Sequence, residues 1–535
     1  MENQGNQETA VPARAGRREW VGLGVLALAC LLYAMDLTVL HLAVPRLSAD
    51  LRPSSAQLLW IVDIYGFLVA GSLITMGTLG DRIGRRRLLM FGAGAFGLAS
   101  LLAAFSTTAT MLIVSRAIMG VAGATLAPST LSLIFNMFMD PKQRSVAVGI
   151  WIASFSAGGA IGPVAGGLLL EYFWWGSVFL LALPVMAVLL LLGPRVLPEF
   201  RDPQAGRLDL RSAGLSLAAI LAVIYGLKQI AQDGFGLVPV LSILAGLALA
   251  VVFLRRQTTL ADPMIDLRLF RIPVFSASLT TYMLSIFVAF GYFLFVAQYL
   301  QLVLGLSPLQ AGLWSLPSGG GFIVGSVLAP MVIHRFRPAI VMGAGLTMAA
   351  AGLLGLFQIG GPSSLTVVVV SSGVIALALA PVITLSTELI VGSAPPERAG
   401  AASGISETSA ELGGALGIAI LGSIGTAIYR RDMAEALPAG IPAAAGETAR
   451  DTLGGAVSVA AELPERLSDA LLDAAHAAFT RGLRLTVAIA AVVAVGVAIL
   501  AATMLRGIRG RSEPAEEAEP AAVADGPVTQ PAVEP

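Results

Sequence analysis

A stretch of small residues, SFSAGGAIGPVAGG from Ser154 to Gly167, lies in the middle of a long apolar run. The smallest side chains recur every four positions, at Ser154, Gly158, Gly162 and Gly166. This spacing gives one face of a helix almost no side chains, so a second helix can approach it closely. Pro163 removes a helix hydrogen bond beside that face and favours a bend. The stretch predicts a tight, deformable seam between two helices that rock, or alternatively ordinary helix packing within a membrane.

The composition indicates a membrane protein. Of the 535 residues, 56% are hydrophobic and 12% are charged, and the mean hydropathy is +0.83. A soluble protein of this size would have about 25% charged residues. The chain is therefore expected to be an all-α polytopic protein embedded in a lipid bilayer. Its formal net charge is zero, which gives no basic surface for a nucleic-acid partner.

Several kinds of chemistry are not expected from this sequence. Cys30 is the one cysteine, which excludes an intramolecular disulfide, and His41, His334 and His476 are too far apart in sequence to suggest a metal site. No phosphate-binding G-x-x-x-x-G-K-[ST] stretch occurs. We therefore do not expect an enzyme or a bound cofactor. We expect an ion gradient to be the source of energy.

A window of about 20 apolar residues predicts fourteen spans. They lie near residues 20–42, 57–79, 87–105, 110–133, 145–170, 174–193, 209–229, 237–254, 274–300, 309–333, 339–358, 364–392, 401–428 and 483–505. Arginine is concentrated in the loops that are internal if the N-terminus is cytoplasmic. The positive-inside rule then places both termini in the cytoplasm. The Arg-rich, Ala-rich composition is typical of a GC-rich bacterium, so the predicted location is the bacterial plasma (inner) membrane.

These spans divide the chain into five parts. They are a cytoplasmic N-terminal segment (1–19), a six-helix half (20–193), two additional helices with linkers (194–273), a second six-helix half (274–507) and a disordered cytoplasmic tail (508–535). Within the second half, an Ala-rich extracellular loop at 430–482 has the pattern of a helical hairpin. It covers the outer mouth or, alternatively, is a surface helix without a role in transport.

The loop between the second and third spans carries the most specific pattern, GTLGDRIGRRRL from Gly77 to Leu88. Its glycines allow a tight turn, and Asp81 can pair with an arginine to form a charged latch, although the arginines alone could be topology signals. Here the chain resembles the major facilitator superfamily, whose signature between these spans is G-x-L-x-D-R-x-G-R-R. The latch residues are Gly77, Asp81, Arg82, Gly84 and Arg85; by resemblance, Asp81, Arg82 and Arg85 help to lock an outward-facing state.

Other stretches resemble the fourteen-span drug:proton antiporter branch of that superfamily, the QacA-like and SmvA-like multidrug exporters. They are MDLTVLHLAVP from Met35, SRAIMGVAGA from Ser115 and the GPVAGG end of the opening stretch, and the resemblance covers residues 18–507. It implies the major facilitator fold, with two six-helix halves and two extra central helices. It also associates the fifth-span motif, Gly158, Gly162, Pro163, Gly166 and Gly167, with antiport.

Three charged residues are predicted at a similar depth in the first, second and fourth spans. Asp36, Asp63 and Arg116 each lie about six residues from the outer end of a span, or roughly 10 Å below the surface. A buried carboxylate is costly unless it is paired or protonated, so these acids are candidates for proton exchange and cation binding. The alternative is a static Asp–Arg bridge. We favour function for Asp36 and Asp63, because two acids share at most one nearby base.

A second acidic pair lies in the thirteenth span. Glu407 and Glu411 are four residues apart on one helical face, so one is expected to hold a proton while the other is ionised. Alternatively, Glu407 is an acid in the first helical turn favoured by the dipole. The resemblance implies substrate or proton roles for both, and for Asp36 and Asp63. The tenth span has no acid, unlike some relatives, which leaves recognition of dications open.

Aromatic and basic residues complete the expected site. Trp60 and Tyr65 flank Asp63 and are candidates for the cavity wall, while His41 is expected to be a satisfied polar residue near a helix end. Lys228 is expected to extend to the membrane interface. Spans seven and eight contain no deep acid and are interpreted as structural additions.

Together these features predict a monomeric, proton-coupled exporter of lipophilic cations such as quaternary ammonium antiseptics, dyes and drugs. Its partners would be these small molecules, protons and lipid, and it would work by alternating access about a central cavity. Two alternatives remain. One is an exporter of a single endogenous metabolite or antibiotic. The other is a non-transporting membrane receptor or scaffold, against which the intramembrane acids argue.

Overall fold

The computed structural model describes residues 14–201, 209–260, 263–333, 335–361, 363–394 and 399–507. Every regular element in these ranges is a helix. Thirteen helices are long and apolar enough to cross a membrane, and a bent helix in the first half makes fourteen. The prediction of an all-α membrane protein with fourteen spans is therefore confirmed. The predicted tail at 508–535 lies outside the described residues, as does most of the segment 1–19.

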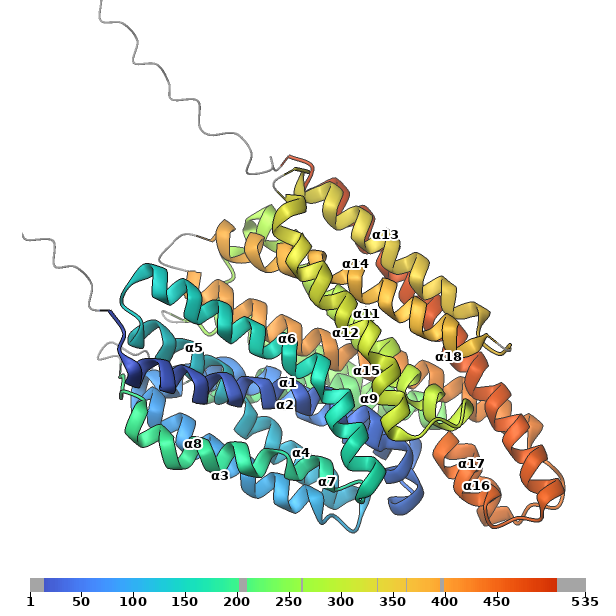
Figure 1. The fold of residues 1–535 in the computed structure, drawn as a ribbon. Helices are drawn as coiled ribbons and strands as arrows, with labels where there is room; N and C mark the ends of the chain where they lie inside the picture. Colours follow the sequence, from blue (N-terminus) through green and yellow to red (C-terminus); the bar gives the residue numbers. More distant parts are fainter. Residues whose placement is uncertain are drawn as a thin grey trace, which may run out of the picture.

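The first half is a bundle of helices that runs from blue to teal in Figure 1. Its elements are α1 (Arg17–Leu51), α2 (Ser55–Ile83), α3 (Arg85–Ala104), α4 (Ala109–Gly123), α5 (Leu126–Met137), α6 (Pro141–Tyr172), α7 (Ser177–Leu180) and α8 (Ala182–Val196). Two of the spans are broken, one between α4 and α5 and one between α7 and α8. This bundle thus supplies six crossings of the membrane.

The second half forms a matching bundle (Figure 1). Its elements are η1 (Leu269–Arg271), α11 (Pro273–Gln298), η2 (Tyr299–Val303), α12 (Pro308–Ile333), α13 (Pro338–Gly355), η3 (Leu356–Gln358), α14 (Ser364–Ser393), α15 (Ala399–Ala436), α16 (Ala443–Asp451), α17 (Leu453–Ala460) and α18 (Glu465–Met504). Six of these helices are long enough to span the membrane. The predicted helical hairpin at 430–482 corresponds to the end of α15, to α16 and α17, and to the start of α18.

Two helices connect the halves, α9 (Leu210–Asp233) and α10 (Leu237–Thr259). The α9 helix packs against α2 of the first half and α15 of the second, whereas the main neighbour of α10 is α9. Large apolar side chains of α10, including Leu241, Leu244 and Val251, are exposed. The α9 helix is therefore part of the contact between the halves, and α10 lies on the outside.

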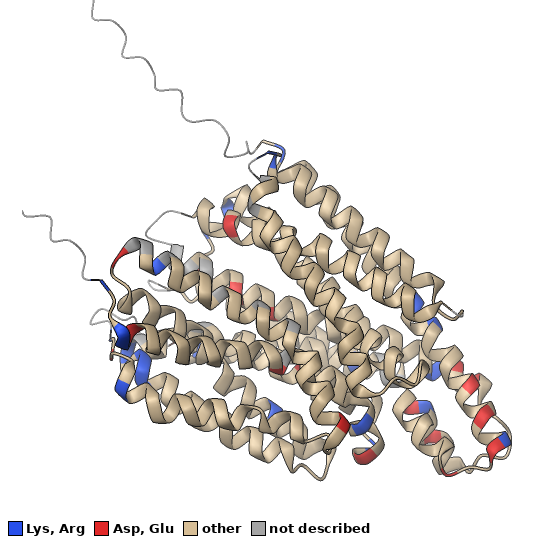
Figure 2. Cartoon of the chain, in the orientation of Figure 1, with Lys and Arg blue, Asp and Glu red and all other residues tan. Residues whose placement is uncertain are grey.

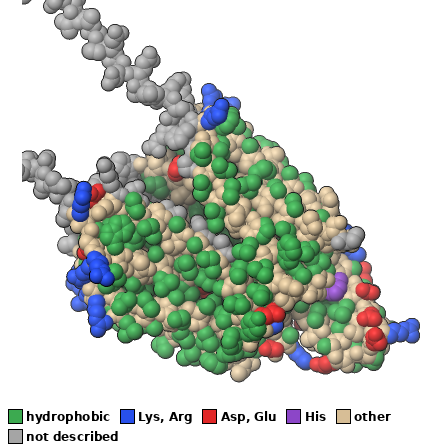
Figure 3. All heavy atoms as spheres, viewed as in Figure 1, with side chains coloured by type: hydrophobic (Ala, Val, Ile, Leu, Met, Phe, Trp, Pro, Cys, Tyr) green, Lys and Arg blue, Asp and Glu red, His purple; other side chains and the backbone are tan. Residues whose placement is uncertain are grey.

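The two ends of the bundle differ in charge and in shape. The described chain begins and ends at the side where the two halves are splayed apart, which we call the terminus side (Figure 1). The opposite end carries α16 and α17, and we call it the hairpin side. Lysine and arginine gather on the terminus side, acidic residues interspersed with arginine lie on the hairpin, and the long helices between are nearly free of charge (Figure 2). Apolar side chains cover the flanks, as expected for a surface in contact with lipid (Figure 3).

Local sequence explains where the helices begin and end. Ser54 caps α2 by accepting a hydrogen bond from the Gln57 amide at 3.2 Å, and Gln57 bonds back to the Ser54 amide at 3.0 Å. Gly84 separates α2 from α3 with a φ of +113°, a backbone conformation that favours glycine. Proline begins α11 and α13, where the missing amide proton costs no helical hydrogen bond.

The α6 helix is bent by 41° between Val146–Gly159 and Ile161–Tyr172. Pro163 explains the bend, because its ring displaces the carbonyl of Gly159 and cannot replace the hydrogen bond that the carbonyl loses. The predicted deformable point therefore lies within the glycine stretch of this helix.

Glycine stripes let α6 and α15 approach their neighbours in equivalent ways. A Cβ atom on Gly158 would lie 2.3 Å from the carbonyl oxygen of Leu31 on α1, and one on Gly417 would lie 2.2 Å from that of Phe287 on α11. The α6 helix also contacts α12, and α15 also contacts α2. Each glycine helix thus joins its own half to the other half, which produces two seams between the halves, α6–α12 and α2–α15.

Candidate functional site

A cavity of about 1940 Å³ lies between the two halves. Its walls come from α1 to α6 on one side and from α11 to α15 on the other. It reaches the terminus side, because its lining includes Arg85 at the start of α3, Val274 at the start of α11 and Ser393 at the end of α14. A volume of this size exceeds that of ordinary small-molecule pockets, roughly 300–1,000 Å³.

The hairpin side of the cavity is closed by contacts between the halves. A Cβ atom on Gly167 of α6 would lie 2.6 Å from the carbonyl oxygen of Pro308 on α12. Gln301 donates a hydrogen bond to the Leu42 carbonyl at 3.0 Å, and Arg52 forms an exposed ion pair with Glu462 at 2.9 Å. The chain in this conformation therefore gives access from the terminus side.

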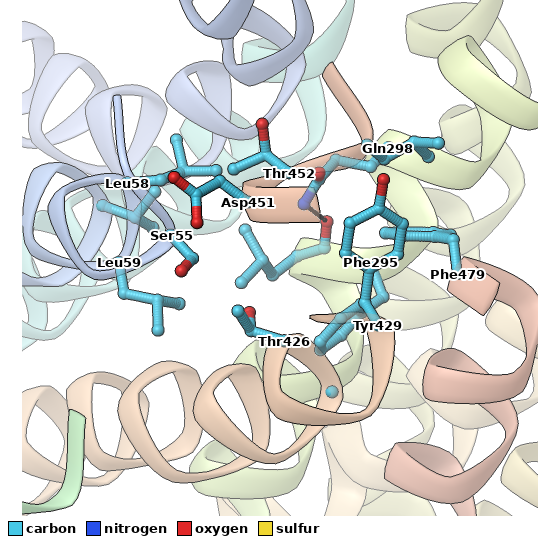
Figure 4. Close-up of a pocket in the computed structure, with 14 residues that line it drawn as sticks. Ser55, Leu58, Leu59, Phe295, Gln298, Thr426, Tyr429, Asp451, Thr452 and Phe479 are labelled. Atoms are coloured by element: carbon cyan, nitrogen blue, oxygen red, sulfur yellow. Dashed lines mark hydrogen bonds between the residues drawn. The ribbon is translucent and has the colours of Figure 1, made fainter. Parts of the chain in front are cut away.

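A small pocket remains on the hairpin side, where α2, α11, α15, α17 and α18 meet (Figure 4). Its volume is about 40 Å³, and Ser55, Gln298, Thr426, Asp451 and Thr452 are among its lining residues. This space suits a few waters rather than a drug-sized molecule.

Asp36 and Arg116 form an ion pair beside the cavity. Arg116 Nη1 lies 2.7 Å from Asp36 Oδ2, and the two side chains are 2% and 11% exposed. The Arg116 guanidinium also lies over the Tyr65 ring, 4.5 Å from its centroid, and donates to the Ile61 carbonyl at 3.4 Å. Arg116 therefore joins α4 to α1 and α2, and the negative charge of Asp36 has a partner within its own half.

Asp63 has a different partner, which sequence analysis did not find. Lys228 Nζ of α9 lies 2.8 Å from Asp63 Oδ1, and both side chains are at most 1% exposed. The expectation that Lys228 extends to the membrane interface is therefore wrong, because α9 packs against α2 and directs this side chain inward. The expectation that Asp36 and Asp63 share one base is also wrong, since each has a cation of its own.

Trp60 and Tyr65 lie in different surroundings. Tyr65 lines the cavity, as predicted. Trp60 is not among the cavity-lining residues; its ring packs with α9 and α15, and Lys228 Nζ lies 4.0 Å from its centroid. His41, which we expected to be satisfied by hydrogen bonds, is 2% exposed and lines the cavity, and its Nδ1 has no hydrogen-bond partner among the described residues.

Glu407 and Glu411 both line the cavity, one helical turn apart on α15. The Tyr33 hydroxyl of α1 donates a hydrogen bond to Glu411. Among the described residues, neither glutamate forms an ion pair with a lysine, arginine or histidine. A further acid, Glu388 on α14, also lines the cavity in an exposed position and was missed in the sequence because it lies near a span end.

The loop between α2 and α3 places its predicted latch residues as follows. Arg82 is exposed, Arg85 is buried and lines the cavity, and the side chain of Asp81 lies outside the part that the structure describes. An unpredicted residue, Glu199, reaches this turn and forms an ion pair with Arg86 at 3.4 Å. The latch role of Gly77, Asp81, Arg82, Gly84 and Arg85 stays a prediction.

The predicted antiporter motif lies along the α6 seams, and its link to antiport stays a prediction. Gly158, Gly162 and Gly166 face α1, where added Cβ atoms would contact Leu31, Thr38 and Val39, and Gly167 faces α12. Pro163 lines the cavity. No group of three or more histidine, cysteine, aspartate or glutamate residues able to hold a metal ion occurs in the described ranges.

Comparison with known proteins assigns this architecture. Residues 26–418 match the family described as the Major Facilitator Superfamily. The chain belongs to this superfamily. It is accordingly a multi-pass membrane transporter rather than an enzyme, and the resemblance seen in its sequence is confirmed.

Similar proteins in this superfamily have names that refer to efflux or drug resistance. The chain is 42% identical over 503 residues to the multidrug efflux pump LfrA of Mycolicibacterium smegmatis, covering 94% of this chain and 98% of that protein. It is 38% identical to the methyl viologen resistance protein SmvA of Salmonella typhimurium, covering 86% and 93%. It is 33% identical to the tetracenomycin C resistance and export protein of Streptomyces glaucescens, covering 95% of each.

Solved structures of transporters share the fold of this superfamily member. A bacterial homologue of the human lysosomal transporter Spinster, in an inward-facing and unoccupied conformation, matches with a TM-score of 0.65 and 19% identity over 92% of this chain and 98% of that chain. The peptide transporter POT in complex with sulfate matches with a TM-score of 0.56 and 17% identity, covering 91% and 96%. At these identities the likeness concerns the fold alone.

Proposed function

We propose that the protein is a proton-coupled antiporter that exports lipophilic cations from the bacterial cytoplasm by alternating access, with both termini cytoplasmic. The names of its relatives support drug efflux as the general activity, since LfrA is a multidrug efflux pump and SmvA confers resistance to the cation methyl viologen. We further propose that it works as a monomer, because a single chain provides the whole cavity.

The observation that carries this proposal is the pair Glu407 and Glu411, which line the cavity without a cationic partner among the described residues. Two carboxylates one turn apart repel each other, so the pair takes up a proton more readily than a lone surface acid. Asp36 and Asp63, by contrast, are already paired with Arg116 and Lys228. Apart from the exposed Glu388 near the opening, the uncompensated negative charge in the cavity therefore lies on α15.

The walls around this acidic pair suit a lipophilic cation. Aromatic side chains line the cavity, among them Tyr33, Tyr65, Trp151, Phe155, Tyr282, Phe290 and Phe293. Aromatic faces attract delocalised cations, and carboxylates supply the opposite charge. The lining residues contributed by α12 are uncharged, so the cavity offers fewer acids to a dication than a pump with an acid in that helix.

These features suggest a transport cycle. With the cavity open at the terminus side, a cation binds the pair and displaces its proton, which leaves toward the cytoplasm. The halves then rock about the α6–α12 and α2–α15 seams and open the hairpin side. A proton from outside neutralises the pair and releases the cation. A ligand can drive such a change only through its different affinity for the two states, which the charge of the pair provides.

The test is transport of ethidium in proteoliposomes under an imposed pH gradient. We expect Glu411→Gln and Glu407→Gln to lose gradient-driven transport by about tenfold or more. Glu388→Gln is the matched control, because Glu388 lines the same cavity but is exposed near its opening, and this variant should keep most of the activity. Equal loss in all three variants, or transport in Glu411→Gln that still follows the gradient, would contradict the assignment.

A narrower exporter is the second candidate. The relative from Streptomyces glaucescens, named for resistance to and export of tetracenomycin C, favours a single endogenous metabolite or antibiotic as the substrate. In that case the protein moves no dye, while one metabolite or antibiotic of the host releases protons from the purified protein. A protein that releases protons with neither class of compound would contradict both candidates.

A further inference from the structure

The transport cycle described above gives no role to the buried pair of Asp63 and Lys228. Both side chains are at most 1% exposed, with 2.8 Å between Lys228 Nζ and Asp63 Oδ1. The second oxygen, Oδ2, is buried without a hydrogen-bond partner among the described residues. Asp63 lines the cavity, whereas Lys228 lies behind it against the Trp60 ring.

The packing of α9 fixes Lys228 at this point. Ile224, one turn before Lys228, is fully buried in an apolar cluster with Phe67 of α2 and with Ala415 and Ala419 of α15. This cluster covers the α2–α15 seam, so the lysine enters from the lipid side of that seam. An isolated lysine here would be very costly, and the carboxylate of Asp63 compensates for its charge.

We propose that Lys228 is a built-in counter-ion that removes Asp63 from the carboxylates that exchange protons in the cavity, and so leaves the exchange to Glu407 and Glu411. While the lysine is in place, Asp63 stays ionised in a neutral pair, and a proton or a substrate cation arriving there meets an existing positive charge. The first of the two additional helices thus sets the ion balance of the transport site and is more than a structural addition.

Other charged groups near the pair are compatible with this role. Arg116 on α4 is a second cation nearby, which donates to the carbonyl of Ile61 on α2 and pairs with Asp36. On α15, the acids that line the same cavity as Asp63 are Glu407 and Glu411. Arg255 and Arg256 lie at the end of α10 away from the α9–α10 turn, and so away from Lys228. There Arg256 pairs with Asp209 at 3.0 Å. Lys228 is accordingly the cation in direct contact with Asp63.

The direct test counts protons released when a cation binds to the purified protein. Tetraphenylphosphonium is titrated calorimetrically in buffers of different ionisation enthalpy, with Lys228→Gln, Lys228→Arg and the double variant Asp63→Asn/Lys228→Gln. Without its counter-ion, Asp63 binds a proton in the empty protein and gives it to the buffer when the cation enters. We expect about one more proton per cation in Lys228→Gln, and the native count in the other two variants.

A native proton count in Lys228→Gln would overturn the role of Lys228. So would an increased count that persists in the double variant, because the additional proton would then not come from Asp63. The proton count rests on the cation binding proposed above, so a second measurement that needs no substrate is required. This measurement is the melting temperature of the same proteins in detergent between pH 5 and pH 8.

In that series, Lys228→Gln should lose stability as the pH rises, because an unpaired buried carboxylate is tolerated only when protonated. In the double variant, the melting temperature should no longer fall in this way as the pH rises. If native protein binds no cation, the proposed function fails, and the melting series alone decides about Lys228. A Lys228→Gln curve parallel to that of the native protein would then overturn the counter-ion role.

Discussion

The Tyr33 hydroxyl donates a hydrogen bond to the carboxylate of Glu411, and this contact joins α1 of one half to α15 of the other. The donor stabilises the ionised form of Glu411, the form expected to bind a cation. In the rocking motion proposed above, α1 and α15 change their relative positions. The contact therefore connects the charge of the site with the arrangement of the halves.

Tyr33→Phe should lower the affinity for tetraphenylphosphonium at neutral pH by about 10-fold to 100-fold, because a hydrogen bond to a charged group contributes about 1.5–3 kcal/mol. Binding should recover at alkaline pH, where Glu411 ionises without help. Tyr65→Phe is the matched control, since the Tyr65 hydroxyl has no hydrogen-bond partner among the described residues. Calorimetric titration measures both, and equal losses would contradict a specific role for Tyr33.

Adjacent glycines on α6 should differ sharply in their tolerance of a methyl group. Gly158→Ala would place a Cβ atom 2.3 Å from the Leu31 carbonyl oxygen, whereas Gly159→Ala meets nothing within 4 Å. We expect Gly158→Ala to destabilise the protein by about 1–3 kcal/mol and to slow transport. Gly159→Ala should be neutral or slightly stabilising. Thermal unfolding in detergent compares them, and similar melting temperatures would rule out a close α6–α1 seam.

Asp209, just before α9, should make the stability of the folded protein depend on pH in the acidic range. Burial acts to raise the pKa of Asp209, but hydrogen bonds from Ser212 and Arg256 outweigh it and lower the pKa from 3.8 to about 2. A group whose pKa is lower in the folded state adds stability above pH 4 and loses it as the pH falls toward 2. The melting temperature of native protein should fall more steeply in this window than that of Asp209→Asn; parallel curves would contradict this.

A disulfide across the closed end should stop transport. A Cβ atom on Gly454 of α17 would lie 2.6 Å from Ser48 Cβ of α1, so a small adjustment allows Ser48→Cys and Gly454→Cys to bond. We expect the oxidised double variant to bind cations but not to transport them, and a reductant to restore transport. Ser48→Cys alone is the control. Full transport by the oxidised protein would contradict opening at the hairpin side.

Hydropathy was sufficient to predict the spans, because each of the fourteen is long, apolar and bounded by polar loops. The presence of Asp63, Arg116, Glu407 and Glu411 at the cavity could likewise be predicted, since an ionisable residue in a span is rarely directed to lipid. These features follow from the chain's interaction with the bilayer, and each can be evaluated one helix at a time.

Pairing between distant helices could not be predicted in the same way. The position of Lys228 near the end of its span favoured the interface, and only the packing of α9 against α2 shows that it contacts Asp63. The contact between Glu199 and Arg86 likewise joins positions far apart in the sequence. A lone lysine in an apolar span and an unpaired acid in another were the available signals.

The bare backbone faces of α6 also affect how easily the halves can move. Interlocked side chains hold two helices in discrete registers, and sliding one helix along the other requires each side chain to leave its groove. Gly167 and Gly312, which face the backbones of α12 and α6 respectively, present no such obstacles. Few side chains therefore interlock at the α6–α12 seam, and the energy barrier to sliding of the two helices is low. The charges in the cavity then decide which way the transporter faces.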